Sequence, residues 1–344
     1  MRLIGLAAAL LLALAPPALA QVGFQTVTAP DPADQPLPVS VWYPTEARGM
    51  PQAIGPYSHE VAPDAPLTPR RRFPLVVISH GSGGSSSNNF DMAAALARAG
   101  FVVAAVTHTG DNSRDPRYVG QPRQFIDRTR HVARVIDYMT GAWTGSSQVD
   151  ARRVGVMGFS AGATTALVSA GGVLDMSRFE EHCRAHPDAG DCRFVAEARK
   201  RAAAAGQGAQ ATPAPAAPAS QRLKWTHDRR VKAAVLIAPA LGSTFTEESL
   251  RRLRVPVQLW AGDKDETTPP AYDAEPVRRS LPSSAAYRLI TNAGHHSFLP
   301  VCPAELQKRG GQICSDPPGF NRAGFRPGFN ASVVEFFTRV LQPR

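Results

Sequence analysis

Ser160 lies in a pentapeptide whose glycine spacing is typical of a nucleophile. Residues 158–162 read Gly-Phe-Ser-Ala-Gly, after a predicted strand at 153–157 and before a small-residue helix at 163–168. G-x-S-x-G between a strand and a helix is the signature of a nucleophile elbow, a strained turn that presents the serine hydroxyl at the top of a sheet. We therefore predict that Ser160 attacks a carbonyl carbon.

A serine hydroxyl is a poor nucleophile until a base takes its proton, so a histidine and an acid are expected downstream. Chains with this elbow place them in the order Ser, Asp or Glu, His. Asp265 lies in the loop after a predicted strand at 255–260, and His295 in the loop after one at 286–290. Both loops start at the carboxyl edge of the predicted sheet, where sites of α/β proteins form. We predict a triad of Ser160, Asp265 and His295.

Each loop also offers other candidates. Asp263 adjoins the end of its strand, where it can serve as a turn residue, and Glu266 directly follows Asp265. His296 follows His295, which we prefer because it comes directly after a glycine. The residues not chosen are expected to orient the loops or to pack beside the site.

Acyl transfer also requires hydrogen-bond donors for the oxyanion that develops on the carbonyl oxygen. One predicted donor is the backbone N–H of Ala161, which begins the elbow helix. The second is expected in the glycine-rich loop 80–84, whose glycines let the backbone turn its amides towards a substrate. We assign it to the N–H of Ser82; the alternative is a flexible turn without a role.

Other groups of polar residues are expected to carry no chemistry. His59 and His131 are predicted to be structural or solvated, because the sequence pairs neither with an acid. Residues 181–192 contain glutamate, histidine, aspartate and cysteine, and could be a metal cluster, but their spacing matches no zinc pattern. We predict neither a metal nor another cofactor.

The elements that must position these loops alternate between strands and helices, which predicts a mainly parallel sheet covered by helices on both faces. The proline-rich stretch 51–69 is expected to be a loop. The eight predicted strands are 23–28, 37–43, 74–79, 101–106, 153–157, 231–237, 255–260 and 286–290, and the main helices are 90–99, 124–139, 163–168 and 332–341.

The 344 residues, of which 43% are hydrophobic, suffice for a single large α/β domain. Residues 1–20 have the positive start, apolar run and small-residue cleavage site of a signal peptide. The domain then spans 21–344, with an insertion at 171–230 after the elbow helix. We expect its first half to be a small cap and the alanine- and proline-rich stretch 202–220 to be a flexible linker.

The four cysteines form two close pairs in the sequence, Cys183 with Cys192 and Cys302 with Cys314. Three pairings are possible, and an oxidising compartment favours bridges. We prefer the local pairs, each clipping one irregular loop, and expect an exported, periplasmic or secreted protein.

The formal net charge is +10, but the basic residues are scattered and no nucleic-acid-binding motif accompanies them. This pattern favours a solvated basic surface over a nucleic-acid site; weak attraction to anionic envelope surfaces is the other reading. No segment after residue 20 is long and apolar enough to span a membrane.

Four segments resemble bacterial hydrolases related to platelet-activating-factor acetylhydrolase and dienelactone hydrolase: 41–44, 73–111, 158–162 and 295–298. The resemblance implies an α/β-hydrolase fold and metal-free cleavage of small-molecule or lipid-like carboxylic esters. It matches Ser160 to the nucleophile, His295 to the base, and the amides of Ser82 and Ala161 to the oxyanion hole. Mammalian acetylhydrolases take their acid from the loop after the sixth strand, but here that loop, 238–242, has no carboxylate. This departure supports Asp265.

The sequence therefore predicts an exported serine ester hydrolase that works through an acyl-enzyme. A serine peptidase or an acyltransferase would use the same residues. A non-catalytic binding protein on a hydrolase scaffold is the alternative outside enzymes.

Overall fold

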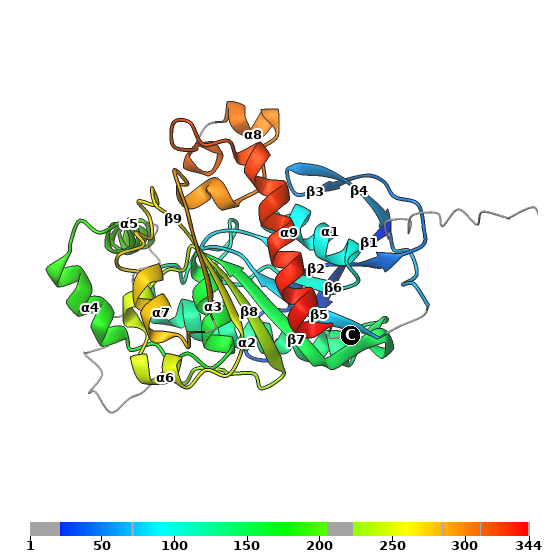
Figure 1. The fold of residues 1–344 in the computed structure, drawn as a ribbon, viewed down its shortest axis with the longest axis horizontal. Coiled ribbons are helices and arrows are strands. Elements are labelled where there is room, and N and C mark those ends of the chain that lie inside the picture. The colour runs from blue at the N-terminus through cyan, green and yellow to red at the C-terminus, as the bar shows by residue number, and fades with distance from the viewer. Residues whose placement is uncertain (1–20, 70–71, 205–222, 284, 310, 343–344) are drawn as a thin grey trace, which may run out of the picture.

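The computed structural model describes residues 21–69, 72–204, 223–283, 285–309 and 311–342, and the predicted signal peptide 1–20 lies outside them. A twisted sheet of ten strands runs through the centre of the molecule (Figure 1). The strands are β1 (Gln21–Ala29), β2 (Leu37–Thr45), β3 (Met50–Ile54), β4 (Tyr57–Pro63), β5 (Phe73–Ser79), β6 (Val102–Val106), β7 (Val149–Phe159), β8 (Val231–Ile237), β9 (Val257–Gly262) and β10 (Ala286–Ile290).

Helices cover both faces of this sheet. α1 (Phe90–Arg98) and α9 (Arg322–Leu341) pack on one face, and α2 (Pro122–Thr140) and α3 (Ala161–Ser169) on the other (Figure 1). Val156 and Met157, neighbours on β7, are buried in different apolar clusters because successive side chains of a strand face opposite ways. Shorter helices are α6 (Glu247–Arg251), α7 (Ala274–Ser280) and α8 (Ala304–Lys308).

The strand order, β10-β9-β8-β7-β5-β6-β2-β1-β4-β3, brings four loops together at one edge. β5 to β10 are parallel, and their register pairs Ser79 with Gly158, Phe159 with Ile237, and Ile237 with Trp260. The loops after β5, β7, β8 and β9 therefore start side by side. All seven residues of β5 are buried, which explains its continuous apolar sequence.

The predicted mainly parallel sheet with helices on both faces is confirmed, and all eight predicted strands are present. The expected loop at 51–69 is wrong, because β3 and β4 form a hairpin there that brings the sheet to ten strands. Its prolines are tolerated because Pro51 lies on the outermost strand and Pro63 ends β4. α9 begins ten residues before the predicted 332; Pro327 and two glycines obscured its first turns.

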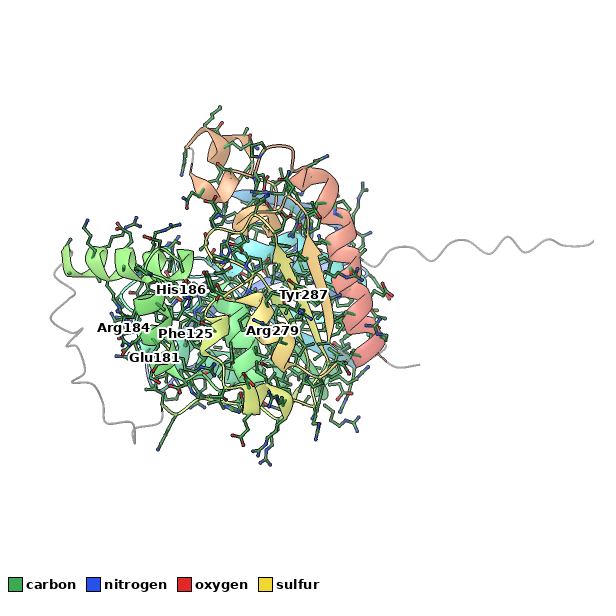
Figure 2. The ribbon with its side chains drawn as sticks, turned by 60° about the vertical axis from the view of Figure 1, so that its left-hand side comes forward. Phe125, Glu181, Arg184, His186, Arg279 and Tyr287 are labelled. Atoms are coloured by element: carbon green, nitrogen blue, oxygen red, sulfur yellow. A yellow bond between two sulfur atoms is a disulfide. The ribbon has the colours of Figure 1, made fainter. Side chains whose placement is uncertain are left out.

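Two helices of the insertion lie beside the carboxyl edge of the sheet as a cap: α4 (Met176–Ala185) and α5 (Gly190–Ala204). A disulfide, Cys183–Cys192, joins them rather than clipping an irregular loop. Figure 2 labels Glu181, Arg184 and His186 on the exposed side of α4 and its end. The predicted linker lies outside the described residues from 205 onwards.

The second predicted disulfide, Cys302–Cys314, is also present and closes the segment that holds α8. In the part of the chain that the structure describes, none of the helices has the length and apolar character needed to cross a membrane.

Candidate active site

Ser160 occupies a strained turn between β7 and α3. Its φ of +56° and ψ of −122° are unusual for a residue with a side chain, as expected of a nucleophile elbow. A Cβ on Gly158 would lie 1.9 Å from the carbonyl oxygen of Gly162, and one on Gly162 would lie 2.0 Å from that of Ser79. Both glycines are therefore required by close backbone contacts.

His295 and Asp265 form a buried pair. His295 Nδ1 lies 2.7 Å from Asp265 Oδ2, while Asp265 Oδ1 accepts the backbone N–H groups of Thr267 (2.9 Å) and Thr268 (2.8 Å). The carboxylate is thus anchored by its own loop and presents its other oxygen to the imidazole. An ionised carboxylate only accepts hydrogen bonds, so His295 carries its proton on Nδ1 and leaves Nε2 able to take another.

Thr268 belongs to the same hydrogen-bonded group and was missed by the sequence reasoning. Its hydroxyl lies 2.9 Å from Asp265 Oδ2 and 3.1 Å from His295 Nδ1, and its side chain is buried. The signal that could have found it is the spacing: a threonine three residues after an aspartate can turn back and bond to it.

The other acids of this loop point elsewhere. Asp263 is exposed and accepts the N–H of Asn292 at 2.6 Å, which ties the loop after β9 to the loop after β10. Glu266 is also exposed. His296 lies beside His295, with 5.2 Å between the ring centroids, and burial lowers the pKa of His296 to about 4, with His295 adding to the effect. The structure brings Asp265, and neither Asp263 nor Glu266, to His295.

Ser160 and His295 line one cavity of about 180 Å³, together with Ser82 and Ala161. Within the described residues, no direct hydrogen bond joins the Ser160 hydroxyl to His295. Catalytic hydrogen bonds of enzymes without substrate are often long and tighten in the complex. A Cβ on Gly81 would lie 3.4 Å from Ser160 Cβ, so the loop after β5 passes directly beside the serine.

The walls of this cavity are largely apolar. The cap supplies several of them, and the helix α2 supplies Phe125, which Figure 2 labels near the cap. The large apolar side chains that line it are Phe125, Phe159, Met176, Phe179, Phe194, Val195 and Leu241. A wider, more polar groove of about 1080 Å³ adjoins it, reaches His295 and Thr267, and is lined by charged residues such as Arg193 and Lys264.

A further buried carboxylate holds the loop after β8, which has no acid of its own. Asp273 is fully buried, and its Oδ1 accepts the N–H of Gly242 at 2.9 Å. Burial raises the pKa of Asp273 well above its ordinary value, and the neighbouring Asp191 raises it further. Its hydrogen bond runs to the loop rather than to His295.

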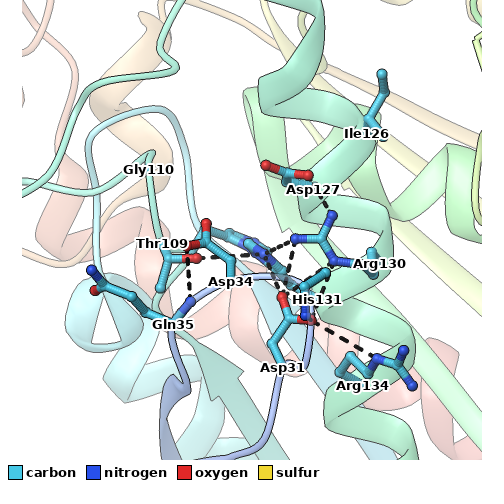
Figure 3. Close-up of polar contacts among 12 residues, drawn as sticks. Asp31, Asp34, Gln35, Thr109, Gly110, Ile126, Asp127, Arg130, His131 and Arg134 are labelled. Carbon is cyan, nitrogen blue, oxygen red and sulfur yellow. Dashed lines mark hydrogen bonds and ion pairs between the residues drawn. The ribbon is translucent and has the colours of Figure 1, made fainter.

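His131 is structural, as predicted, but the expectation that no acid pairs with it is wrong. Its Nε2 lies 3.4 Å from Asp31 Oδ2, and Arg130 and Arg134 also approach that carboxylate (Figure 3). Asp31 and His131 lie 100 residues apart, so only the fold reveals the pair. Burial lowers the pKa of His131 to about 4.

His182, Asp191 and Cys192 lie close together in the cap. They belong to the group of residues 181–192 that the sequence offered as a possible metal cluster. Cys192 is bonded to Cys183, however, and so offers no thiolate to a metal. Glu181 and His186 are exposed. The group is a disulfide flanked by a His182–Asp191 contact of 3.2 Å.

Comparison with known proteins finds similarity to a family model over part of the chain and to solved structures. The family model described as platelet-activating factor acetylhydrolase, isoform II, matches residues 46–127, which contain Ser82. Among solved structures, the ferulic acid esterase from Streptomyces cinnamoneus is similar, with a TM-score of 0.63 and 23% identity over 96% of this chain and 93% of that one. No curated protein matches the sequence. The α/β-hydrolase fold predicted from the sequence is confirmed.

Proposed function

We propose that this protein is a serine hydrolase that cleaves carboxylic esters with Ser160, His295 and Asp265. The observation that carries the proposal is the Asp265–His295 pair at 2.7 Å, whose imidazole lines the same apolar cavity as a serine on a strained elbow. The similarity to an acetylhydrolase family and to an esterase supports ester chemistry.

In this mechanism, His295 Nε2 takes the proton of the Ser160 hydroxyl as Oγ attacks the ester carbonyl carbon. The N–H groups of Ser82 and Ala161 donate to the resulting oxyanion. The carbon–oxygen bond to the alcohol then breaks, and His295 returns the proton to the leaving alcohol. Water, deprotonated by His295, attacks the acyl-enzyme, releases the carboxylic acid and restores Ser160. Asp265 keeps the imidazole in the required tautomer.

The cavity and the adjoining groove suggest which ester fits the site. The cavity of about 180 Å³ beside Ser160 is small and apolar, so we propose that it holds a compact apolar acyl group. The larger polar groove reaches His295, which must protonate the leaving alcohol, so we propose that the alcohol lies there. The preferred substrate is then an ester with a short or flat acyl chain and a larger, polar alcohol.

Hydrolysis of p-nitrophenyl esters of increasing acyl length, measured beside Ser160→Ala, tests the proposal. We expect turnover that falls beyond short acyl chains and disappears in the variant. Stoichiometric labelling of Ser160 by a phosphonate without ester turnover would replace the esterase with a peptidase or acyltransferase. If the protein is neither labelled by the phosphonate nor active on any ester, the result would point to a non-catalytic binding protein.

We further propose that the protein is exported, because both predicted disulfides form in the structure and such bonds persist in oxidising compartments. Mass spectrometry of the protein from periplasm and medium should find a chain that begins at Gln21. A chain that retains residues 1–20 in the cytoplasmic fraction would contradict export.

A further inference from the structure

The carbonyl oxygen of Gly81, at the start of the predicted oxyanion loop, is surrounded by donors. It accepts the N–H of Gly84 at 3.0 Å, His80 Nδ1 lies at 2.6 Å, and Arg128 Nη2 donates to it at 3.2 Å. This carbonyl belongs to the peptide unit whose N–H is that of Ser82. In a trans peptide the C=O and the N–H are coplanar and point in opposite directions.

Arg128 enters from α2 and is buried, with 1% of its side chain exposed. Its guanidinium also donates to the carbonyl of His80 (Nη1, 2.7 Å) and to the carboxylate of Asp111 (Nε, 2.6 Å). A buried arginine is costly unless its charge is paired and its donors are satisfied. Here the donors are used on two successive carbonyls of the loop after β5.

Asp111 holds the other side of Ser82. Its Oδ1 accepts the N–H of Gly83 at 2.8 Å, and its Oδ2 accepts Gln124 Nε2 at 2.5 Å. Gln124 Nε2 in turn lies 2.7 Å from Ser82 Oγ. The ion pair thus fixes the peptide before Ser82 through its carbonyl and the peptide after it through its N–H.

From this arrangement we propose that the buried Arg128–Asp111 pair is a positioning device for the oxyanion hole, which holds the N–H of Ser82 towards the reacting carbonyl. The inference rests on the proposed esterase function. Arg128 donates a hydrogen bond to the Gly81 carbonyl, which points away from the N–H of Ser82. The Gly81–Ser82 peptide therefore cannot turn this N–H away from the site without breaking the hydrogen bonds to the carbonyl. Hydrogen bonds accepted by a carbonyl also polarise its peptide and strengthen the N–H as a donor.

His80 contributes to the same device as a neutral ring. Its Nε2 accepts the N–H of His108 at 3.1 Å, so its proton lies on Nδ1, where it is donated to the Gly81 carbonyl. Burial lowers the pKa of His80 to about 3, with Arg128 adding to the effect, so the ring stays neutral at neutral pH.

The network continues below the loop. Ser79 Oγ lies 3.2 Å from Arg128 Nη1 and 2.8 Å from His108 Nε2, and His108 Nδ1 lies 3.2 Å from His131 Nδ1. His131 connects it to Asp31 in the cluster of Figure 3. The loop is therefore anchored to α2 and to the turn after β1, both outside the catalytic residues.

The test compares Arg128→Lys with Arg153→Lys. Lysine keeps the charge beside Asp111 but cannot donate to the carboxylate and to both carbonyls with the same geometry. Arg153 is a matched control, because it pairs with Asp150 (2.9 Å) and donates to the carbonyl of Arg72 (2.6 Å) near the start of β7, at the other end of the strand from Ser160. Asp111→Asn, which keeps an acceptor for Gly83, is the second variant.

Oxyanion binding acts in the transition state alone, so kcat should fall while KM changes little. For Arg128→Lys we expect kcat on p-nitrophenyl acetate to fall about 10- to 100-fold, since removal of one oxyanion donor costs about 10²- to 10³-fold. Asp111→Asn should also lower kcat on p-nitrophenyl acetate, but by a smaller factor. Arg153→Lys should keep the kcat of the unchanged protein.

A sulfur analogue separates positioning from general loosening of the fold. The thionoester of the same acid develops charge on sulfur, which accepts hydrogen bonds weakly, so an intact oxyanion hole favours the oxygen ester. The rate on the oxygen ester divided by the rate on the thionoester should fall in Arg128→Lys and stay unchanged in Arg153→Lys. A folded Arg128→Lys protein with unchanged kcat and ratio would overturn the inference, as would a lower kcat with an unchanged ratio. If the unchanged protein hydrolyses no ester, the proposed function fails instead.

Discussion

Replacement of Asp265 by asparagine should reverse the tautomer of His295. Oδ1 of Asp265 accepts two backbone N–H groups, from Thr267 and Thr268, so the asparagine oxygen must take that position. Its amide nitrogen then occupies the place of Oδ2, which lies 2.7 Å from His295 Nδ1. An NH₂ group there donates to Nδ1 and moves the imidazole proton to Nε2, where it blocks acceptance of the Ser160 proton.

The size of the effect follows from which interactions survive. The shape, the two backbone bonds and the oxyanion donors are kept, while the base is disabled. The same aspartate-to-asparagine change in a serine protease lowers kcat about 10⁴-fold, which corresponds to about 5.4 kcal/mol of transition-state stabilisation. We expect a loss of this order on p-nitrophenyl acetate at neutral pH, with a thermal midpoint close to that of the unchanged protein.

Asp263→Asn and Glu266→Gln are the matched controls, because both side chains are exposed and the Asp263 replacement still accepts the N–H of Asn292. Each should change kcat by less than about threefold, as is usual for surface substitutions. The reasoning is refuted if Asp265→Asn retains kcat within tenfold, or if either control loses activity instead.

Three further changes test other parts of the structure. Thr268→Val removes a hydroxyl that lies 2.9 Å from Asp265 Oδ2. Since a hydrogen bond to a charged group contributes about 1.5–3 kcal/mol, kcat on p-nitrophenyl acetate should fall about 10- to 100-fold, and an unchanged kcat would remove Thr268 from the site. Cys183→Ser with Cys192→Ser opens a bridge between residues nine apart, which by chain entropy should lower the free energy of unfolding in urea by about 2.7 kcal/mol. Reduction of the unchanged protein also opens Cys302–Cys314 and should therefore lower the free energy of unfolding by more, and a variant as stable as the unchanged protein would contradict this expectation. Asp273 keeps its proton in the folded protein at pH values where the unfolded chain has released it. The free energy of unfolding should therefore decline as the pH rises from the ordinary pKa of 3.8 through the raised pKa of Asp273. Asp273→Asn should flatten this decline when unfolding in urea is measured across the pH range, and an unchanged decline would contradict the assignment.

The sheet could be predicted because its strands have local signatures. β5 reads as an unbroken apolar run because it is buried on both faces, and the elbow glycines are fixed by backbone contacts that admit no other residue. The placement of Asp265 and His295 followed from the rule that loops at one sheet edge meet. The β3–β4 hairpin was missed because prolines, which disfavour central strands, are tolerated on its outer strand.

Arg128 shows where sequence reasoning stopped short. Phe125, Val132 and Val135 lie on the buried face of α2, and Arg128 comes three residues after the first and four before the second. It therefore occupies the buried face of the helix, where a charge signals a partner inside the protein. The partner, Asp111, lies in a loop with no periodic pattern, so the pair appears only when the fold brings them to 2.6 Å.

The glycines of the loop after β5 explain why such a pair is needed. Gly81, Gly83 and Gly84 let the backbone pass close to Ser160 and adopt a positive φ at Gly83. The same freedom leaves the loop many other conformations, and fixing each residue costs about 1–2 kcal/mol of backbone entropy. An N–H that must await a developing charge has to be held before the substrate arrives, because reorientation during the reaction would consume the stabilisation it gives. Within the loop, the His80 side chain supplies one hydrogen bond to the Gly81 carbonyl, and residues 81–84 have no bulky side chain to add others. The remaining side-chain hydrogen bonds must come from outside the loop, and Arg128 and Asp111 are charged residues whose hydrogen bonds reach the peptides on either side of Ser82.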